Sequence, residues 1–79
     1  MPTKAYILIE TDVGKSRDVA GELNALNGIT TVDAVTGPYD IISVVEAPDL
    51  NAVGDLVTSR IHKINGITRT VTCLSVGSS

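Results

Sequence analysis

One segment of the chain combines groups that could bind a small polar molecule. Gly37-Pro38-Tyr39-Asp40 places a flexible backbone, a phenol hydroxyl and a carboxylate next to one another. Glycine lets backbone N–H groups approach an anionic carboxylate, and aspartate can accept hydrogen bonds from an ammonium group. The segment is therefore typical of a site for a free amino acid. It is equally typical of a simple β-turn in which the aspartate caps the turn and the tyrosine packs on a neighbour.

A second candidate is the pair Thr70 and Thr72. Residues two apart in a strand project from the same face, so the two hydroxyls should be aligned. Aligned hydroxyls can hydrogen-bond a small polar ligand. They can also simply pack, because threonine is common in β-rich sequences.

Other possible chemistries are incomplete in this sequence. Gly14-Lys15-Ser16 lies between a predicted strand and a predicted helix, but Ile9 stands where a phosphate-binding loop needs its first glycine. His62 is expected on a solvated surface without a second ligand at metal-binding spacing. Cys73 lacks a histidine partner and is expected to be a small buried hydrophobic residue. The carboxylates form no convergent acid–base set, so we expect no cofactor, no metal and no catalysis.

Charge and composition exclude further classes. The six basic residues are scattered and the formal net charge is −3, which does not favour a phosphate-binding surface. The chain contains neither Phe nor Trp to stack bases. Its apolar runs are far shorter than the roughly 20 residues of a membrane span, and its start does not resemble a signal peptide. We expect a cytoplasmic protein that binds neither nucleic acid nor membranes.

Hydrophobic periodicity predicts six elements within a single domain, residues 1–79. Short apolar runs predict strands over residues 5–9, 29–36, 41–45 and 67–76. Helical spacing of apolar residues predicts helices over residues 15–26 and 50–64, with Asp49 as the N-cap of the second.

This order, β-α-β-β-α-β, contains an internal repeat. Leu26-Asn27-Gly28-Ile29-Thr30 corresponds to Ile64-Asn65-Gly66-Ile67-Thr68, so each half is one split βαβ unit. Right-handed connections then place both helices on one face of a four-stranded antiparallel sheet. The predicted fold class is α+β, a ferredoxin-like sandwich.

The strands over residues 5–9 and 41–45 are apolar at consecutive positions, so both faces of the sheet carry hydrophobic side chains. Two helices cover only one of these faces. Monomeric proteins rarely expose a large apolar patch. We therefore expect a homodimer that packs sheet against sheet around a twofold axis.

With these motifs, the chain resembles the effector-binding and oligomerisation domain of the Lrp/AsnC transcription regulators, also called the regulation of amino acid metabolism domain. The resemblance covers residues 4–76, and its most specific elements are Gly-Pro-Tyr-Asp at 37–40, the Asn-Gly-Ile before the last strand, and Thr-Val-Thr at 70–72. It implies a ferredoxin-like dimer that assembles further, often into octamers, with amino-acid effectors between dimers. The ligand-binding residues implied are Gly37, Tyr39, Asp40, Thr70 and Thr72. Val71 departs from the family, which frequently has an acidic residue there.

Full-length members of that family carry an N-terminal helix-turn-helix domain, whereas the first strand here is expected within a few residues of Met1. The resemblance thus implies a stand-alone form that senses amino acids without binding DNA itself, and that can co-assemble with a full-length regulator. Three alternatives stay open. They are a ligand-free assembly module in mixed oligomers, an ACT-like amino-acid-binding domain, and a small dimeric monooxygenase-type enzyme, which would lack a credible acid, base or nucleophile.

Overall fold

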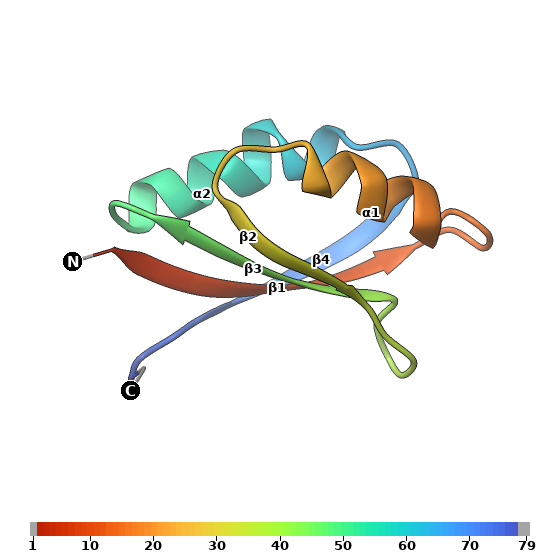
Figure 1. The fold of residues 1–79 in the computed structure, drawn as a ribbon, viewed down its shortest axis with the longest axis horizontal. Helices are drawn as coiled ribbons and strands as arrows, with labels where there is room; N and C mark the ends of the chain where they lie inside the picture. Colours follow the sequence, from red (N-terminus) through yellow and green to blue (C-terminus); the bar gives the residue numbers. More distant parts are fainter. Residues whose placement is uncertain (1, 78–79) are drawn as a thin grey trace.

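Four strands and two α-helices follow one another in the order β-α-β-β-α-β, as described for residues 2–77 by a computed structural model. The elements are β1 (Thr3–Thr11), α1 (Ser16–Asn24), β2 (Ile29–Ala34), β3 (Ile41–Ala47), α2 (Leu50–Ser59), the short 3-10 helix η1 (Ile61–Lys63) and β4 (Ile67–Leu74). The strands form one antiparallel sheet in the order β2-β3-β1-β4, and both helices lie on the same side of it (Figure 1). The predicted α+β ferredoxin-like architecture is confirmed.

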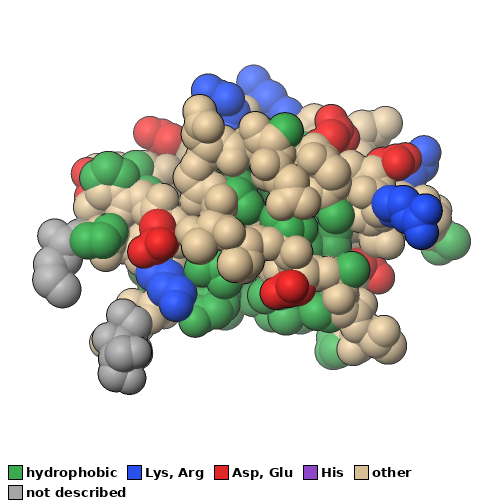
Figure 2. All heavy atoms as spheres, viewed as in Figure 1, with side chains coloured by type: hydrophobic (Ala, Val, Ile, Leu, Met, Phe, Trp, Pro, Cys, Tyr) green, Lys and Arg blue, Asp and Glu red, His purple; other side chains and the backbone are tan. Residues whose placement is uncertain are grey.

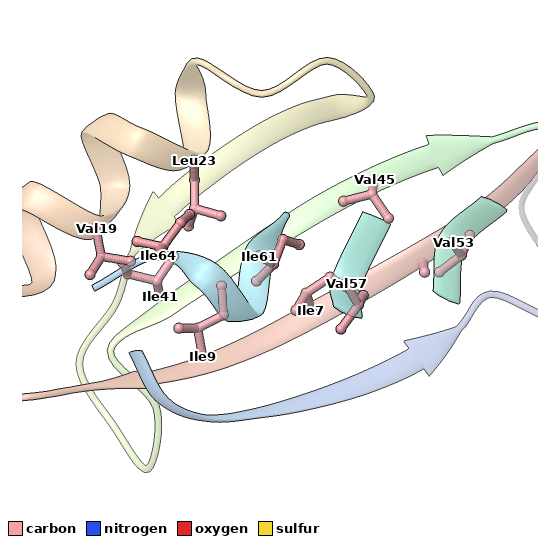
Figure 3. Packing of buried hydrophobic residues seen from close by; sticks show 11 residues of the cluster. Ile7, Ile9, Val19, Leu23, Ile41, Val45, Val53, Val57, Ile61 and Ile64 are labelled. Carbon is pink, nitrogen blue, oxygen red and sulfur yellow. The ribbon is translucent and has the colours of Figure 1, made fainter. Parts of the chain in front are cut away.

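The hydrophobic core lies between the sheet and the helices (Figure 3). In β1 and β3, alternate side chains point toward the helices and are buried, as the two-residue period of a strand requires. The helices contribute one apolar stripe each, and the segment after α2 contributes two isoleucines. The buried hydrophobic residues are Ala5, Ile7, Ile9, Val19, Leu23, Ile41, Val45, Val53, Val57, Ile61 and Ile64.

Two helices end earlier than the hydrophobic pattern predicts. Helix α1 ends at Asn24 rather than near residue 26. Helix α2 ends at Ser59, because Arg60 leaves the helical region with φ −121° and ψ −55°, and η1 follows as a separate turn. Ile61 and Ile64 stay buried nevertheless. The prediction of one continuous helix over residues 50–64 is therefore wrong.

The start of α2 agrees with the sequence. Asp49 has an extended backbone, and its Oδ1 accepts a hydrogen bond from the Ala52 N–H at 2.8 Å. A side chain in this position satisfies one of the N–H groups that a helix leaves free at its N-terminus. The predicted N-cap is confirmed.

The face of the sheet away from the helices, here called the open face, carries apolar side chains on its central strands. Leu8 of β1 and Ile42 and Val44 of β3 are half-buried there, and Tyr6 is 38% exposed. Cys73 lies opposite Tyr6 in the β1–β4 ladder and is exposed. The prediction that Cys73 is buried is wrong, because its strand position points to the side without helices.

The sequence repeat has a structural counterpart in two glycine connections. After α1, the carbonyl of Gly28 accepts a hydrogen bond from Glu46 N–H at 3.1 Å, at the end of β3. After α2, the carbonyl of Gly66 accepts one from Asp12 N–H at 2.8 Å, just beyond β1. Both glycines have positive φ, +93° and +105°, which ordinary side chains rarely adopt. Each helix is thus tied by the same device to the strand of the other half.

Charged side chains are spread over the surface. In Figure 2, Lys and Arg side chains occupy several separate regions of this side of the molecule, some of them adjacent at the top of the view, and Asp and Glu side chains lie between these regions. Within residues 2–77, no helix has the length and apolar character needed to cross a membrane.

Candidate functional site

The 37–40 turn joins β2 to β3 and is fastened to β1 through Asp40. The Asp40 N–H donates to the carbonyl of Ile9 at 2.9 Å, and its own carbonyl accepts from Val35 N–H at 2.9 Å. Its carboxylate Oδ2 accepts from the Thr11 N–H at 2.8 Å. The aspartate therefore caps backbone, as one interpretation of the sequence predicted, but the backbone it caps belongs to β1 and not to the turn.

The turn keeps groups available for a ligand. Gly37 has φ +154°, and no atom lies within 4 Å of the position that a Cβ would occupy there. Among residues 2–77, the Tyr39 hydroxyl and the Asp40 Oδ1 have no hydrogen-bond partner. Both side chains are half-buried. The hydroxyl can thus donate to or accept from an incoming polar group, and the carboxylate oxygen can accept from it.

Thr70 and Thr72 share one face of β4. Thr70 lies opposite Ile9 and Thr72 opposite Ile7 in the β1–β4 ladder, so both side chains are on the helix side of the sheet. The predicted alignment is confirmed. Thr70 is half-buried, whereas Thr72 is exposed, so neither is a core residue.

His62 was considered from the sequence only as a metal ligand, and its contact with a predicted site residue was not expected. It is exposed, as predicted, but its Nε2 lies 2.8 Å from the Thr70 hydroxyl oxygen. The contact joins η1 to the edge strand β4 across a turn at Asn65 and Gly66. No local motif signals it, because the position of a histidine relative to a later strand depends on how the turn folds back.

A pocket of about 340 Å³ opens beside this pair. Its lining residues are His62, Ile67, Thr68, Arg69 and Thr70. The Thr68 hydroxyl donates to the Glu10 carbonyl at 3.2 Å, and Arg69 Nη1 lies 3.3 Å from Glu10 Oε2. The Arg69 side chain remains 65% exposed. Thr70 and His62 are therefore the polar lining groups that are not already engaged with Glu10.

The two predicted sets of residues lie at the same end of the sheet but on opposite sides of β1. Ile9 of β1 pairs with Ile41 next to the turn and, on its other side, with Thr70. The pocket at Thr70 includes none of Gly37, Tyr39, Asp40 or Thr72. Within one chain, that pocket thus contains one of the five predicted residues.

A larger hollow of about 700 Å³ lies elsewhere, along α2 and the connection from α1 to β2. It contains none of the predicted residues. No group of three or more His, Cys, Asp or Glu side chains in residues 2–77 is arranged to hold a metal ion.

Comparison with known proteins specifies the family to which this ferredoxin-like domain belongs. Residues 4–78 match the family model of the Lrp/AsnC ligand binding domain. An HTH-type transcriptional regulator of Pyrococcus horikoshii is 32% identical over 76 residues, which cover 92% of this chain and 51% of the relative. The chain belongs to the Lrp/AsnC ligand-binding domain family. It spans about half the length of the curated relatives that it matches.

Solved structures agree on the fold. The protein TTHA0845 from Thermus thermophilus is 28% identical with a TM-score of 0.92, covering 98% of this chain and 96% of that chain. A feast or famine regulatory protein of M. tuberculosis, solved in complex with L-methionine, is 19% identical with a TM-score of 0.83, covering 96% of this chain and 51% of that chain. The curated relatives are HTH-type transcriptional regulators, and two of the regulators that share the fold were solved in complex with L-methionine.

Proposed function

We propose that this domain reversibly binds a small amino acid between subunits and that binding controls its assembly. The observation that supports this function is the division of the candidate groups into two sets. Asp40 and Tyr39 stand on one side of β1, and the Thr70 pocket stands on the other. A second subunit that brings its 37–40 turn against this pocket would complete a site for both charged ends of an amino acid.

Assembly starts, in this proposal, with two copies that pack through the open face. Its half-buried residues Leu8, Ile42 and Val44 occupy the two central strands, where sheet-on-sheet packing would remove them from water. Dimers then associate further, to an octamer in the arrangement that the family resemblance implies. The subunit interfaces between dimers hold the effector.

The output of binding is a change of assembly and not a chemical reaction. The pocket does bring the Thr70 hydroxyl within 2.8 Å of the His62 Nε2, but none of its lining residues is a carboxylate that would orient the imidazole as the third member of a catalytic set. The dispersed basic residues argue against direct contact of this domain with DNA. We place its action in the cytoplasm, either alone or in mixed oligomers with a full-length Lrp/AsnC regulator.

Calorimetric titration of the 79-residue chain against the twenty common amino acids, including L-methionine, tests the proposal. At least one should bind, and sedimentation should show that the same amino acid changes the oligomer distribution. Tyr39→Phe removes only a hydroxyl, and we expect it to weaken binding about tenfold.

Asp40 needs a more careful substitution, because its carboxylate also holds Thr11 N–H. Asp40→Asn keeps an oxygen for that hydrogen bond and removes the charge that would meet an ammonium group. We expect at least a roughly tenfold loss of affinity with an unchanged unfolding midpoint. A calorimetric titration in which none of the twenty amino acids binds would reject amino-acid binding. Assembly that ignores every amino acid would instead favour a ligand-free assembly module.

A further inference from the structure

The direction of the hydrogen bond between His62 and Thr70 determines whether the Thr70 hydroxyl can donate to a ligand oxygen or only accept from a ligand ammonium group. The two atoms, Nε2 and Oγ1, lie 2.8 Å apart. If Nε2 donates, Thr70 keeps its own hydroxyl proton and can give it to a ligand oxygen. If Nε2 accepts, that proton is used up, and only lone pairs remain for an ammonium group. The protonated nitrogen of the histidine therefore sets the polarity of the site.

The backbone of Thr70 adds a donor at the same place. Ser75 N–H donates to the Lys4 carbonyl at 2.9 Å, which continues the β1–β4 ladder and fixes its alternation. Arg69, Val71 and Cys73 accordingly direct their N–H and carbonyl groups toward β1. Thr70, between them, directs its N–H to the outer edge of β4, where the sheet has no further strand. A ligand beside His62 thus meets a hydroxyl and an N–H from one residue.

An anionic ligand group would meet no acidic side chain among the residues that line the pocket. The chain carries nine acidic residues, yet none of the five residues that line this pocket is acidic. Arg69 lines it as well, but its side chain points to the open face, where a guanidinium nitrogen lies 3.3 Å from Glu10 Oε2, so its charge is paired on the other side of the sheet. A bound carboxylate is usually surrounded by hydrogen-bond donors and not by other carboxylates.

His62 is held firmly enough to orient its neighbour. It lies between Ile61, which is fully buried, and Lys63 in η1, and the turn is closed by Ile64 N–H donating to the Ile61 carbonyl at 3.1 Å. Ile64 is also buried. Two anchored isoleucines therefore fix the backbone of His62 beside β4, and the contact of Nε2 with Thr70 Oγ1 positions the ring.

We propose that this pocket recognises the α-carboxylate of the amino-acid effector, with Thr70 as the contacting residue and His62 as a positioning residue. His62 donates from Nε2 to Thr70 Oγ1 and thereby turns the Thr70 hydroxyl proton toward the ligand. The ammonium group then falls to Asp40 of the partner subunit. This inference rests on the proposed function and adds the orientation of the effector within the site.

The chain offers a direct reporter, because it contains a single histidine. Every imidazole resonance in an NMR spectrum therefore belongs to His62. The ¹⁵N shifts of the ring should identify Nε2 as protonated, and each amino acid that binds by calorimetry should displace these resonances. The α-carboxamide of the same amino acid, which keeps the ammonium group and side chain, should bind at least roughly tenfold more weakly.

Substitutions of His62 distinguish a role in positioning Thr70 from a purely structural role. We expect His62→Ala to weaken the amino acid about tenfold while leaving its already weak carboxamide nearly unchanged. His62→Gln, whose amide N–H can replace the Nε2 donor, should restore most of the affinity. Lys63→Ala is the matched control, because Lys63 is exposed on the same 3-10 helix and lines a different hollow. It should bind like the parent chain.

The outcomes distinguish the two proposals. Binding of an amino acid with equal affinity for its carboxamide, or with unmoved His62 resonances, overturns the carboxylate pocket and leaves the proposed function intact. An unprotonated Nε2 overturns the assigned polarity. No binding by any amino acid defeats the proposed function itself.

Discussion

At the scale of the residue, two aspartates use the same chemistry for different ends. Asp49 and Asp40 each accept a hydrogen bond from a backbone N–H at 2.8 Å. Asp49 does so within its own helix, and its role ends there. Asp40 reaches from the β2–β3 turn to β1, so it fixes the turn and still has one oxygen without a partner among residues 2–77. A carboxylate can therefore be structural and available to a ligand at once.

Removal of the Asp49 cap gives a stability prediction. Asp49→Ala leaves the Ala52 N–H without its side-chain acceptor, and we expect the free energy of unfolding to fall by about 1 kcal/mol. Chemical denaturation at fixed protein concentration measures this change. Asp55→Ala is the control, since Asp55 is an exposed residue of the same helix whose side chain has no hydrogen bond to other residues of 2–77. A loss equal to that of the control would contradict the capping role.

Some single-residue features could be predicted from the sequence and others could not. Asp49 was predictable, because an N-cap depends on neighbours three residues away. The exposure of Cys73 and the contact of His62 with Thr70 were not, because each depends on which way a strand faces after a turn. Conversely, the 37–40 turn was visible as a motif, but its position relative to Thr70 required the sheet order.

At the scale of the element, the order of strands and helices followed from periodicity, whereas the break in the second helix did not. Ile61 and Ile64 continue the apolar spacing of α2 because a 3-10 turn places residues i and i+3 on one side, much as an α-helix does. The hydrophobic stripe is the same for both conformations. The pattern therefore identifies the buried face but not the end of the α-helix.

The two glycine connections differ in how closely they are packed, and this difference is testable. A Cβ on Gly66 would lie 3.1 Å from both Lys15 Cβ and Val19 Cγ2, whereas a Cβ on Gly28 would lie 3.5 Å from Leu56 Cδ2. Both positions have positive φ, so Gly28→Ala should lower the free energy of unfolding by roughly 1 kcal/mol. Gly66→Ala should cost about 1 kcal/mol more, because it adds a clash against buried Val19.

Gly54→Ala provides the comparison for both substitutions. Gly54 lies inside α2, and nothing within 4 Å would meet its Cβ. Alanine is the better helix former there, so we expect a gain of about 0.5–1 kcal/mol in thermal or chemical unfolding. Equal losses for Gly28→Ala and Gly66→Ala would show that the packing difference has no energetic effect.

At the scale of the whole molecule, the two faces of the sheet differ in what covers them. The helix side is filled by the core, and the open face presents apolar side chains from both central strands. Its periphery is polar, with Glu10 and Arg69 paired across β1 and β4. An apolar centre with a charged rim is the usual composition of a protein interface.

A charge placed on the centre of the open face should prevent the proposed dimer. In Leu8→Lys, the ammonium group would have to be buried between two sheets, so we expect monomers at micromolar concentration where the parent chain sediments as a dimer or larger. Asn51→Lys adds the same charge to an exposed position of α2 and should leave assembly unchanged. A monomeric parent chain would refute dimerisation through this face.

The antiparallel pairing of β1 with β4 carries one last consequence. Lys4 and Ser75 are hydrogen-bonded neighbours, so the chain enters and leaves the sheet at one extremity, remote from the 37–40 turn (Figure 1). A fluorophore attached next to Lys4 or Ser75 would lie away from that turn. These two residues are also close enough for a peptide linker to connect the segments that flank them, and opening the chain between Gly37 and Pro38 would yield a permuted protein with all four strands in place.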